Sequence, residues 1–326
     1  MEFVRDFQLL YRLLLVDGIG RSGKVMLAEI LTGYNSVEKQ EYNEFFEYIS
    51  LAYKHDKISL DMAQSILKTQ IDGELYNSMI GRNVNSRPED YTSINKFHSP
   101  EKYIKRWNLK DGNFVKERVE EEKPIYLNWC HDLINKSELI FETFEKKVSL
   151  IYMNRRPIDI IYEWEQKNFG NRIAEDPTDL TYLIRYKDVQ VPEMVIGWEE
   201  EYILAAPLER IILIIHGLFK KNLEAIKKTK HKNQILIINF EDLVVDTPNT
   251  LNCISNFLSL EPLDFMDSIL LKENCPRKLS SQEYGKRKNN ISNQLSEQNL
   301  SYLDEMDDMY LKISSYSINK NNFKFI

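Results

Sequence analysis

The sequence has little cysteine, no long hydrophobic run and no excess of positive charge. Its three cysteines, Cys130, Cys253 and Cys275, lack the spacing of a metal site. Their odd number and scatter favour a reducing compartment. A formal net charge of −7 argues against a general nucleic-acid binder, because neutralising phosphates needs a basic surface.

The apolar runs are too short for a transmembrane helix. The strongest of them covers residues 211–215, whereas a membrane span needs about 20 apolar residues. The N-terminus has neither the basic start nor the small-residue cleavage site of a signal peptide. We therefore expect a soluble, cytoplasmic protein without a membrane span.

Residues 13–31 form the most informative stretch. The apolar run 13–16 is followed by a turn rich in small residues, and then by an apolar pattern with helical spacing. This order predicts a buried parallel strand, a glycine turn and a helix. Glycines let the backbone approach a ligand, and the free N–H groups of a helix start attract anions. With Arg21 and Lys24 added, the turn is predicted to bind a phosphate or sulfate; the alternative is a plain turn with solvent-facing cations.

The same turn satisfies most of the P-loop pattern, as Gly18-x4-Gly23-Lys24. Val25 stands where a P-loop has the Ser or Thr that holds magnesium, and a valine cannot bind a metal. An ordinary magnesium-nucleotide kinase is therefore disfavoured. A P-loop kinase or NTPase that uses Lys24 on the β- and γ-phosphates stays as an alternative.

Strands alternate with helices along the rest of the chain, which indicates a parallel α/β sheet. Further strands are predicted at 124–129, 148–153 and 235–240. Helical patterns cover 36–80, 137–147, a segment from Ile158, 198–229 with a break near Pro207, a segment from Thr247, and 297–313.

Three polar segments interrupt this alternation. Residues 81–123 contain many turn signals, residues 170–195 are polar and punctuated by proline, and residues 272–290 are basic and predicted to be a loop. Because loops on a rigid scaffold often contact substrate, we expect 81–123 and 170–195 to be substrate-side insertions.

Three short motifs each follow a predicted strand. They are Arg21-Ser22-Gly23, Arg155-Arg156-Pro157-Ile158-Asp159 and Phe240-Glu241-Asp242-Leu243. In this order they resemble the sulfotransferase superfamily, over roughly residues 9–290. The resemblance implies one domain, 1–326, with a P-loop-like parallel sheet flanked by helices and with mainly helical and irregular insertions. It also implies transfer of a sulfuryl group from 3′-phosphoadenosine 5′-phosphosulfate, without a metal, to a hydroxyl or amine of a small-molecule, glycan or lipid acceptor.

The resemblance also implies roles for individual residues. Arg21 and Lys24 would hold the 5′-phosphosulfate and offset the charge that grows on the leaving phosphate. Arg155 matches the arginine that binds the 3′-phosphate, and Arg277 is similar to part of a segment that closes over the same group. The complete implied donor site is Gly20, Arg21, Ser22, Gly23, Lys24, Val25, Arg155, Arg277 and Lys278.

A group is also needed to take the acceptor's proton. His131 lies in the segment before the Arg-x-Pro strand, where many members of the family have a histidine, and imidazole titrates near neutral pH. His98 and Asp132 are the other candidates, and a structural histidine is the alternative. His55, His216 and His231 are interpreted as structural.

The chain departs from the family pattern at two places. Lys24-Val25 replaces a pair of threonines, and Glu163 stands where the family has a serine for the 3′-phosphate. A carboxylate repels a phosphate unless it points away or pairs with a cation. Arg155 or Arg156 could also pair simply with Asp159. These departures leave a third hypothesis, a non-catalytic binding protein on a sulfotransferase scaffold.

Overall fold

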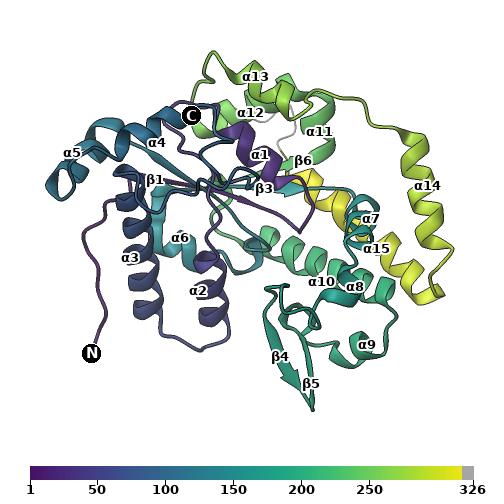
Figure 1. Ribbon diagram of the computed structural model, residues 1–326. Helices are drawn as coiled ribbons and strands as arrows, with labels where there is room; N and C mark the ends of the chain where they lie inside the picture. Colours follow the sequence, from purple (N-terminus) through teal and green to yellow (C-terminus); the bar gives the residue numbers. More distant parts are fainter. Residues whose placement is uncertain (318–326) are drawn as a thin grey trace.

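Within residues 1–317, which the computed structural model describes, four parallel strands form the central sheet (Figure 1). Their order is β2-β1-β3-β6, and neighbouring strands are parallel throughout. The strands are almost wholly buried, as their continuous apolar runs predict. They are β1 Arg12–Asp17, β2 Ile125–Trp129, β3 Val148–Asn154 and β6 Ile235–Asn239. The predicted α/β fold class, a parallel sheet flanked by helices with mainly helical insertions, is confirmed.

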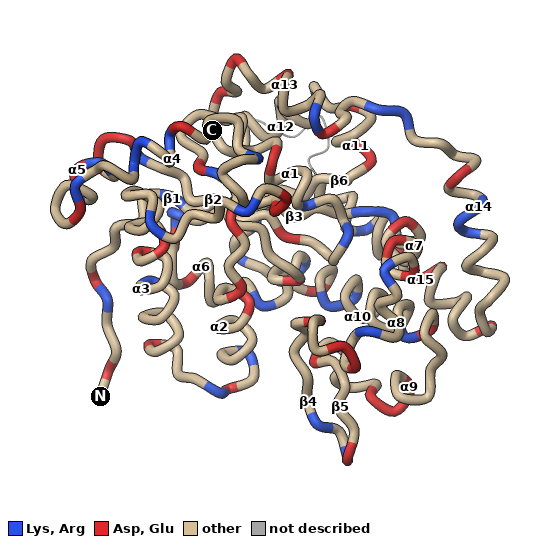
Figure 2. Tube along the Cα trace, in the orientation of Figure 1, with Lys and Arg blue, Asp and Glu red and all other residues tan. Residues whose placement is uncertain are grey.

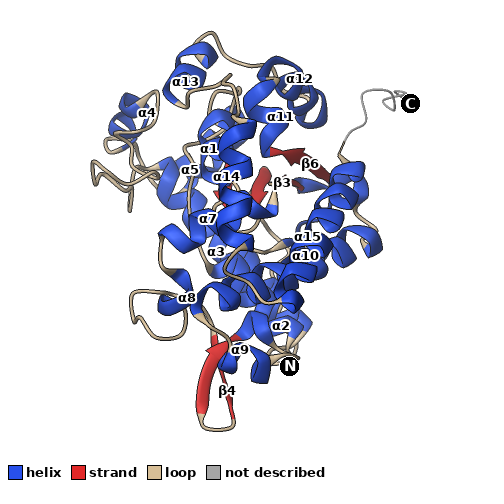
Figure 3. Ribbon diagram, turned by 90° about the vertical axis from the view of Figure 1, so that its right-hand side faces the viewer, coloured by secondary structure: helices blue, strands red, loops and turns tan. Residues whose placement is uncertain are grey.

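Alternate residues of each strand face opposite sides of the sheet, and each side has its own hydrophobic core. Leu13 and Leu15 of β1 belong to one core, and Leu14 and Val16 to the other (Figure 3 gives the side view). Helices that contribute to the first core include α3 Leu60–Met79, α6 Glu138–Phe144, α7 Pro157–Gln166, α10 Pro207–Lys228 and α15 Glu297–Tyr316. The second core includes α1 Lys24–Leu31, α11 Phe240–Val245, α12 Thr247–Leu258 and α13 Met266–Lys272.

The helices predicted from apolar spacing are present. The segment 36–80 contains α2 Phe45–Lys54 and α3, and the segment 198–229 is divided into α9 Glu199–Leu204 and α10. Pro207 opens α10 at its first position, where a missing N–H costs nothing. Single 3-10 turns are η1 Ile134–Lys136, η2 Glu145–Lys147 and η4 Lys232–Gln234.

Two predicted boundaries are wrong. The basic segment 272–290 is not a loop throughout, because α14 Ser281–Ser292 begins inside it. The Ser280 hydroxyl accepts the N–H of Glu283 at 3.2 Å, which is the helix-start arrangement that a Ser-x-x-Glu pattern favours. The strand expected over 235–240 ends at Asn239, and its last residue, Phe240, instead begins α11.

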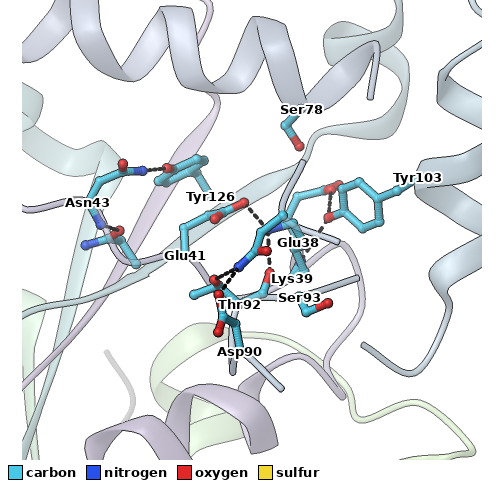
Figure 4. A network of polar contacts seen from close by, with 12 residues as sticks. Glu38, Lys39, Glu41, Asn43, Ser78, Asp90, Thr92, Ser93, Tyr103 and Tyr126 are labelled. Atoms are coloured by element: carbon cyan, nitrogen blue, oxygen red, sulfur yellow. Dashed lines mark hydrogen bonds and ion pairs between the residues drawn. The ribbon is translucent and has the colours of Figure 1, made fainter. Parts of the chain in front are cut away.

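The segment 81–123 is less irregular than predicted, since it contains α4 Pro100–Arg106 and α5 Asn113–Glu122. A buried polar network holds it against the β2 edge of the sheet (Figure 4). Glu38, which precedes a short bridge to this edge, accepts hydrogen bonds from Tyr103, Lys102 and Arg106. Lys39 donates to the carbonyl of Thr92 at 2.9 Å.

The segment 170–195 is a surface excursion, as predicted. It begins within α8 Phe169–Arg172. It contains an antiparallel hairpin, formed by β4 Leu183–Tyr186 and β5 Val189–Pro192, and ends with the 3-10 turn η3 Glu193–Val195. The hairpin projects away from the central sheet (Figures 1 and 3).

Charged residues of both signs are spread over the whole trace (Figure 2). The net charge of −7 is therefore distributed rather than gathered on one element. Among residues 1–317, no helix combines the length and the apolar character needed to cross a membrane.

Candidate functional site

Most of the predicted site residues lie at the carboxyl ends of strands, whereas Arg277 and Lys278 follow α13. β1 leads into the glycine turn, β2 into His131, β3 into Arg155 and β6 into Phe240. Because β1 lies between β2 and β3, the connection from β1 to β2 and the connection from β2 to β3 run in opposite directions across the sheet. Such a switch point opens a crevice at the carboxyl edge, which is where open α/β sheets bind ligands.

The glycine turn has the backbone shape of an anion-binding loop. Gly18, Arg21 and Gly23 have positive φ angles of 153°, 68° and 95°. A side chain on Gly23 would start 2.5 Å from the ring of Phe240, so only glycine fits there. The N–H of Ser22 is used within the turn, on the carbonyl of Ile19 at 3.0 Å. The first N–H groups of α1 have no partner within the helix and are free for a ligand.

The side chain of Lys24 lies beneath this turn. Its ammonium donates to the carbonyls of Gly18 and Ile19 at 3.1 and 3.3 Å, and the residue is 2% exposed. Burial lowers the pKa of Lys24, and the nearby charges of Asp132 and Asp17 oppose that shift. What Lys24 offers to a ligand is therefore a helix-start N–H and a positive charge below the loop.

Glu163, the departure that put a phosphate site in doubt, pairs with a cation. Its Oε2 accepts from Arg21 Nη2 at 2.8 Å and from Nε at 3.3 Å. The Arg21 side chain is 46% exposed at the rim of the turn. The pairing meets the condition under which a carboxylate beside a phosphate is tolerated.

Arg155 and Arg277 meet on one aromatic ring. Their guanidinium carbons lie 4.4 and 5.4 Å from the ring centre of Phe240, which also contacts the turn at Gly23. Arg155 Nη1 donates to the carbonyl of Arg21 at 2.6 Å, while its buried Nε has no partner in the described chain. Sequence reasoning missed Phe240, because the motif that contains it was read for its acidic residues. Lys278 is exposed next to this group.

The neighbouring arginine has a structural role. Arg156 Nη2 lies 2.7 Å from Asp159 Oδ2, and its guanidinium stacks on Tyr284 of α14. Arg287, also on α14, holds the other oxygen of Asp159 at 2.8 Å. The pairing to Asp159 considered from the sequence therefore belongs to Arg156, and Arg155 is left facing the turn.

A cavity of about 280 Å³ opens beside the turn. The segment 170–195 supplies part of its lining, whereas none of the lining residues in the described structure comes from 81–123. Sequence reasoning also missed the contribution of α2 and the loop before it. The lining residues are Gly20, Arg21, Tyr42, Glu47, Tyr48, Leu51, His131, Asp132, Asn135, Lys136, Trp164, Phe169, Ile173, Asp179, Leu180, Thr181, Tyr182, Glu193, Met194, Leu218 and Lys221.

His131 lies in this cavity, edge-on to the rings of Tyr42 and Trp129. Its backbone N–H donates to Glu47 Oε1 at 2.7 Å, and its ring Nδ1 lies 3.8 Å from the same oxygen. Burial and the charge of Lys24 lower the pKa of His131, and Glu47 opposes them. A lowered pKa favours the neutral imidazole, which is the form that can accept a proton.

Asp132 lines the same cavity. Its φ of 51° is left-handed, and its buried Oδ1 has no hydrogen-bond partner among the described residues. Burial and the charge of Asp17 raise the pKa of Asp132 to about 7, against the opposing charge of Lys24. The turn is fixed from β1, since the Asp17 carboxylate accepts the N–H groups of Leu133 and Ile134 at 3.0 and 2.6 Å. A carboxyl that titrates near neutral pH is a second possible proton acceptor.

The other histidines lie outside the cavity lining. His98 bonds to the carbonyl of Thr32 at 3.1 Å and stacks on Phe265. His55, His216 and His231 contact Glu193, Glu305 and Gln234, as structural side chains do. Over the described range 1–317, no group of three or more His, Cys, Asp or Glu side chains is arranged to hold a metal ion.

No protein-family model and no curated protein sequence matches this chain. It is similar to solved structures that include three sulfotransferases. The sulfotransferase domain from the curacin biosynthetic pathway has 10% identity and a TM-score of 0.43, over 80% of this chain and 77% of that one. The sulfotransferase domain of the Synechococcus PCC 7002 olefin synthase has 12% identity and a TM-score of 0.44, over 98% of this chain and 99% of that one. Sulfotransferase STF9 from Mycobacterium avium has 9% identity and a TM-score of 0.38, over 95% of this chain and 77% of that one.

Proposed function

We propose that the protein is a single-domain sulfotransferase that moves a sulfuryl group from 3′-phosphoadenosine 5′-phosphosulfate to a hydroxyl or amine. One observation carries the proposal: a glycine turn with the backbone shape of an anion-binding loop and two candidate proton acceptors border the same cavity. Gly20 and Arg21 of the turn line this cavity together with His131 and Asp132. Group transfer needs a held donor, a nearby acceptor and a base, and all three places are adjacent.

The residues around the turn fit a phosphorylated nucleotide. The buried Nε of Arg155 and the buried hydroxyl of Ser22 have no hydrogen-bond partner within residues 1–317, and a phosphate oxygen would supply one. Glu163 does not oppose this, because Arg21 already holds its carboxylate. Arg155, with Arg277 on the same ring, would hold the 3′-phosphate. Gly20, Arg21, Ser22, Gly23, Lys24 and Val25 would hold the 5′-phosphosulfate, and Lys278 would extend the site at its rim.

The chain's own groups would do three things during transfer. The N–H groups at the start of α1, with Arg21 and the buried charge of Lys24, would stabilise negative charge on the leaving phosphate. The bond from sulfur to the acceptor oxygen or nitrogen forms as the sulfur–oxygen bond to that phosphate breaks. His131 would take the acceptor's proton on a ring nitrogen, with Asp132 as the alternative base. The segment 170–195 would form the outer wall of the acceptor site.

Calorimetric titration with 3′,5′-adenosine bisphosphate, beside ATP with and without magnesium, tests this proposal. We expect magnesium-independent binding of the bisphosphate, weakened at least tenfold by Arg155→Ala, because a buried charge-assisted contact contributes about 1.5–3 kcal/mol. Arg185→Ala, on the exposed hairpin, is the matched control.

Each other outcome points to another function. Binding of Mg-ATP alone would favour the P-loop kinase or NTPase that uses Lys24. Binding of the bisphosphate without any turnover of the donor would favour a non-catalytic protein on this scaffold. If neither nucleotide binds, the donor site is refuted.

A further inference from the structure

One wall of the cavity carries two lysines, and neither ammonium forms a direct ion pair with a carboxylate of residues 1–317. Lys136, at the end of η1, and Lys221, on α10, both line the cavity. Lys221 donates to the carbonyl of Met194 at 2.9 Å and lies 5.2 Å from the ring centre of Trp198. Lys136 makes no side-chain hydrogen bond and no ion pair with any residue of the described chain, although it is only partly exposed.

The carboxylate on this wall, that of Glu193, also bonds to a histidine outside the cavity lining. Glu193 accepts from the ring of His55 at 2.9 Å. Lys54, at the end of α2, adds a third ammonium behind the wall, where it donates to Asn135 Oδ1 at 3.1 Å. Burial lowers the pKa of Lys221, the charges of Glu193 and Asp132 oppose that shift, and the charge of Lys136 adds to it. The lysines are therefore close enough to repel one another, and an anion placed between them would relieve that repulsion.

Two other carboxylates of the lining accept hydrogen bonds from backbone N–H groups. Glu47 accepts the backbone N–H of His131, and Asp179 accepts the N–H of Thr181 at 3.0 Å. Asp132 lies beside His131, close to the turn. The polar groups of the cavity are thus divided between the candidate bases, which lie beside the turn, and the lysine wall, on whose Lys221 both Glu193 and Asp132 act electrostatically.

Apolar side chains complete the cavity lining. Leu51, Ile173 and Leu218 contribute aliphatic surface, and Trp164 contributes an aromatic ring. The lining therefore offers a hydrophobic body to a ligand, a proton acceptor at one place and ammonium groups at another. In a lining that mixes apolar and polar side chains, the polar groups fix the orientation and the specificity of a ligand.

From this division we infer that the acceptor is an apolar hydroxy acid, whose carboxylate or phosphate is bound by Lys136 and Lys221 while its hydroxyl lies at His131 and Asp132. The transfer of a sulfuryl group to this hydroxyl rests on the proposed sulfotransferase function. The binding of the anion does not, because it depends only on the two lysines and the apolar lining.

Calorimetry on the full chain tests the inference with four probes that each contain eight carbons. They are ω-hydroxyoctanoate, ω-hydroxyoctyl phosphate, octanediol and ω-amino-octanol, each titrated with and without saturating 3′,5′-adenosine bisphosphate. We expect the carboxylate or the phosphate to bind at least tenfold more tightly than the diol, and the tighter of the two identifies the anion. Lys136→Met should remove that preference and leave diol binding unchanged. Lys57→Met, an exposed lysine outside the cavity, is the matched control.

The outcomes separate this inference from the proposed function. Equal binding of the acids and the diol, tighter binding of the amine, or no effect of Lys136→Met would overturn the anion-binding wall. Lysine-dependent acid binding without any binding of the adenosine bisphosphate would uphold the wall and refute the sulfotransferase. Nucleotide binding without a preference for acids would do the reverse.

Discussion

Replacing Glu38 by glutamine perturbs the contact that holds the segment 81–123 against the sheet. The buried carboxylate receives two hydrogen bonds from Arg106, at 2.7 and 3.0 Å, and one from Lys102 at 2.8 Å. Burial by itself would raise the pKa of Glu38, but the charges of Lys102 and Arg106 outweigh it and lower the pKa to about 2. The carboxylate is therefore charged in the folded protein over the whole ordinary pH range.

The size of the effect follows from that pKa. The difference between the ordinary 4.5 and about 2 corresponds to about 3 kcal/mol, since a tenfold change in proton affinity is about 1.4 kcal/mol. The folded pKa is the lower one, so this stabilisation is complete above the unfolded value and is lost as the pH falls through the folded value. The same magnitude is typical when one partner of a buried ion pair is removed.

Urea unfolding measures this contribution. At pH 7 the free energy of unfolding of Glu38→Gln should be about 3 kcal/mol below that of the wild type, and the gap should narrow as the pH falls from about 5 toward 2. Glu122→Gln removes a 2.9 Å contact to the same Arg106, but Glu122 is 40% exposed, so its loss should stay below about 1 kcal/mol. Equal losses in the two variants, or a gap that does not change with pH, would refute this reasoning.

Three further changes test the site, by the release of adenosine bisphosphate from the sulfate donor or by the affinity for the bisphosphate. His131→Ala should abolish transfer and leave calorimetric binding of the bisphosphate nearly intact; full activity would remove the base assignment. If Asp132 is the base instead, wild-type activity should rise as the pH passes about 7, because burial raises the pKa of Asp132 to about 7 and a base must be deprotonated to act. Asp132→Asn should then remove that rise, and an unchanged profile would exclude Asp132. Gly23→Ala should weaken bisphosphate binding at least tenfold, because φ is 95° and the new Cβ meets Phe240 at 2.5 Å; unchanged affinity would contradict the turn as the binding element.

Much of the fold could be predicted because the signals are local. The run 13–16 and its glycine turn identify β1 and α1, and the break before Pro207 is visible in the sequence. The helix α14 was not predicted because the segment 272–290 is basic and lacks a clear apolar pattern. Its only local helix signal is the Ser-x-x-Glu pattern at Ser280.

The parts of the site that escaped prediction depend on contacts between distant segments. The ring of Phe240 gathers Arg155 and Arg277 although more than a hundred residues separate the two arginines along the chain. The burial of Lys24 beneath the turn, and the pairing of Glu163 with Arg21, depend on packing that no local pattern encodes. These contacts are what make the two departures from the family pattern compatible with a phosphate site.

A crystal structure of the protein with 3′,5′-adenosine bisphosphate tests the central claim most directly. The account predicts that the 5′-phosphate lies against the N–H groups of Gly23 and Lys24, and that the 3′-phosphate lies within hydrogen-bonding distance of the Arg155 guanidinium. A nucleotide bound elsewhere, or bound at the turn with its 3′-phosphate pointing away from Arg155, would contradict it.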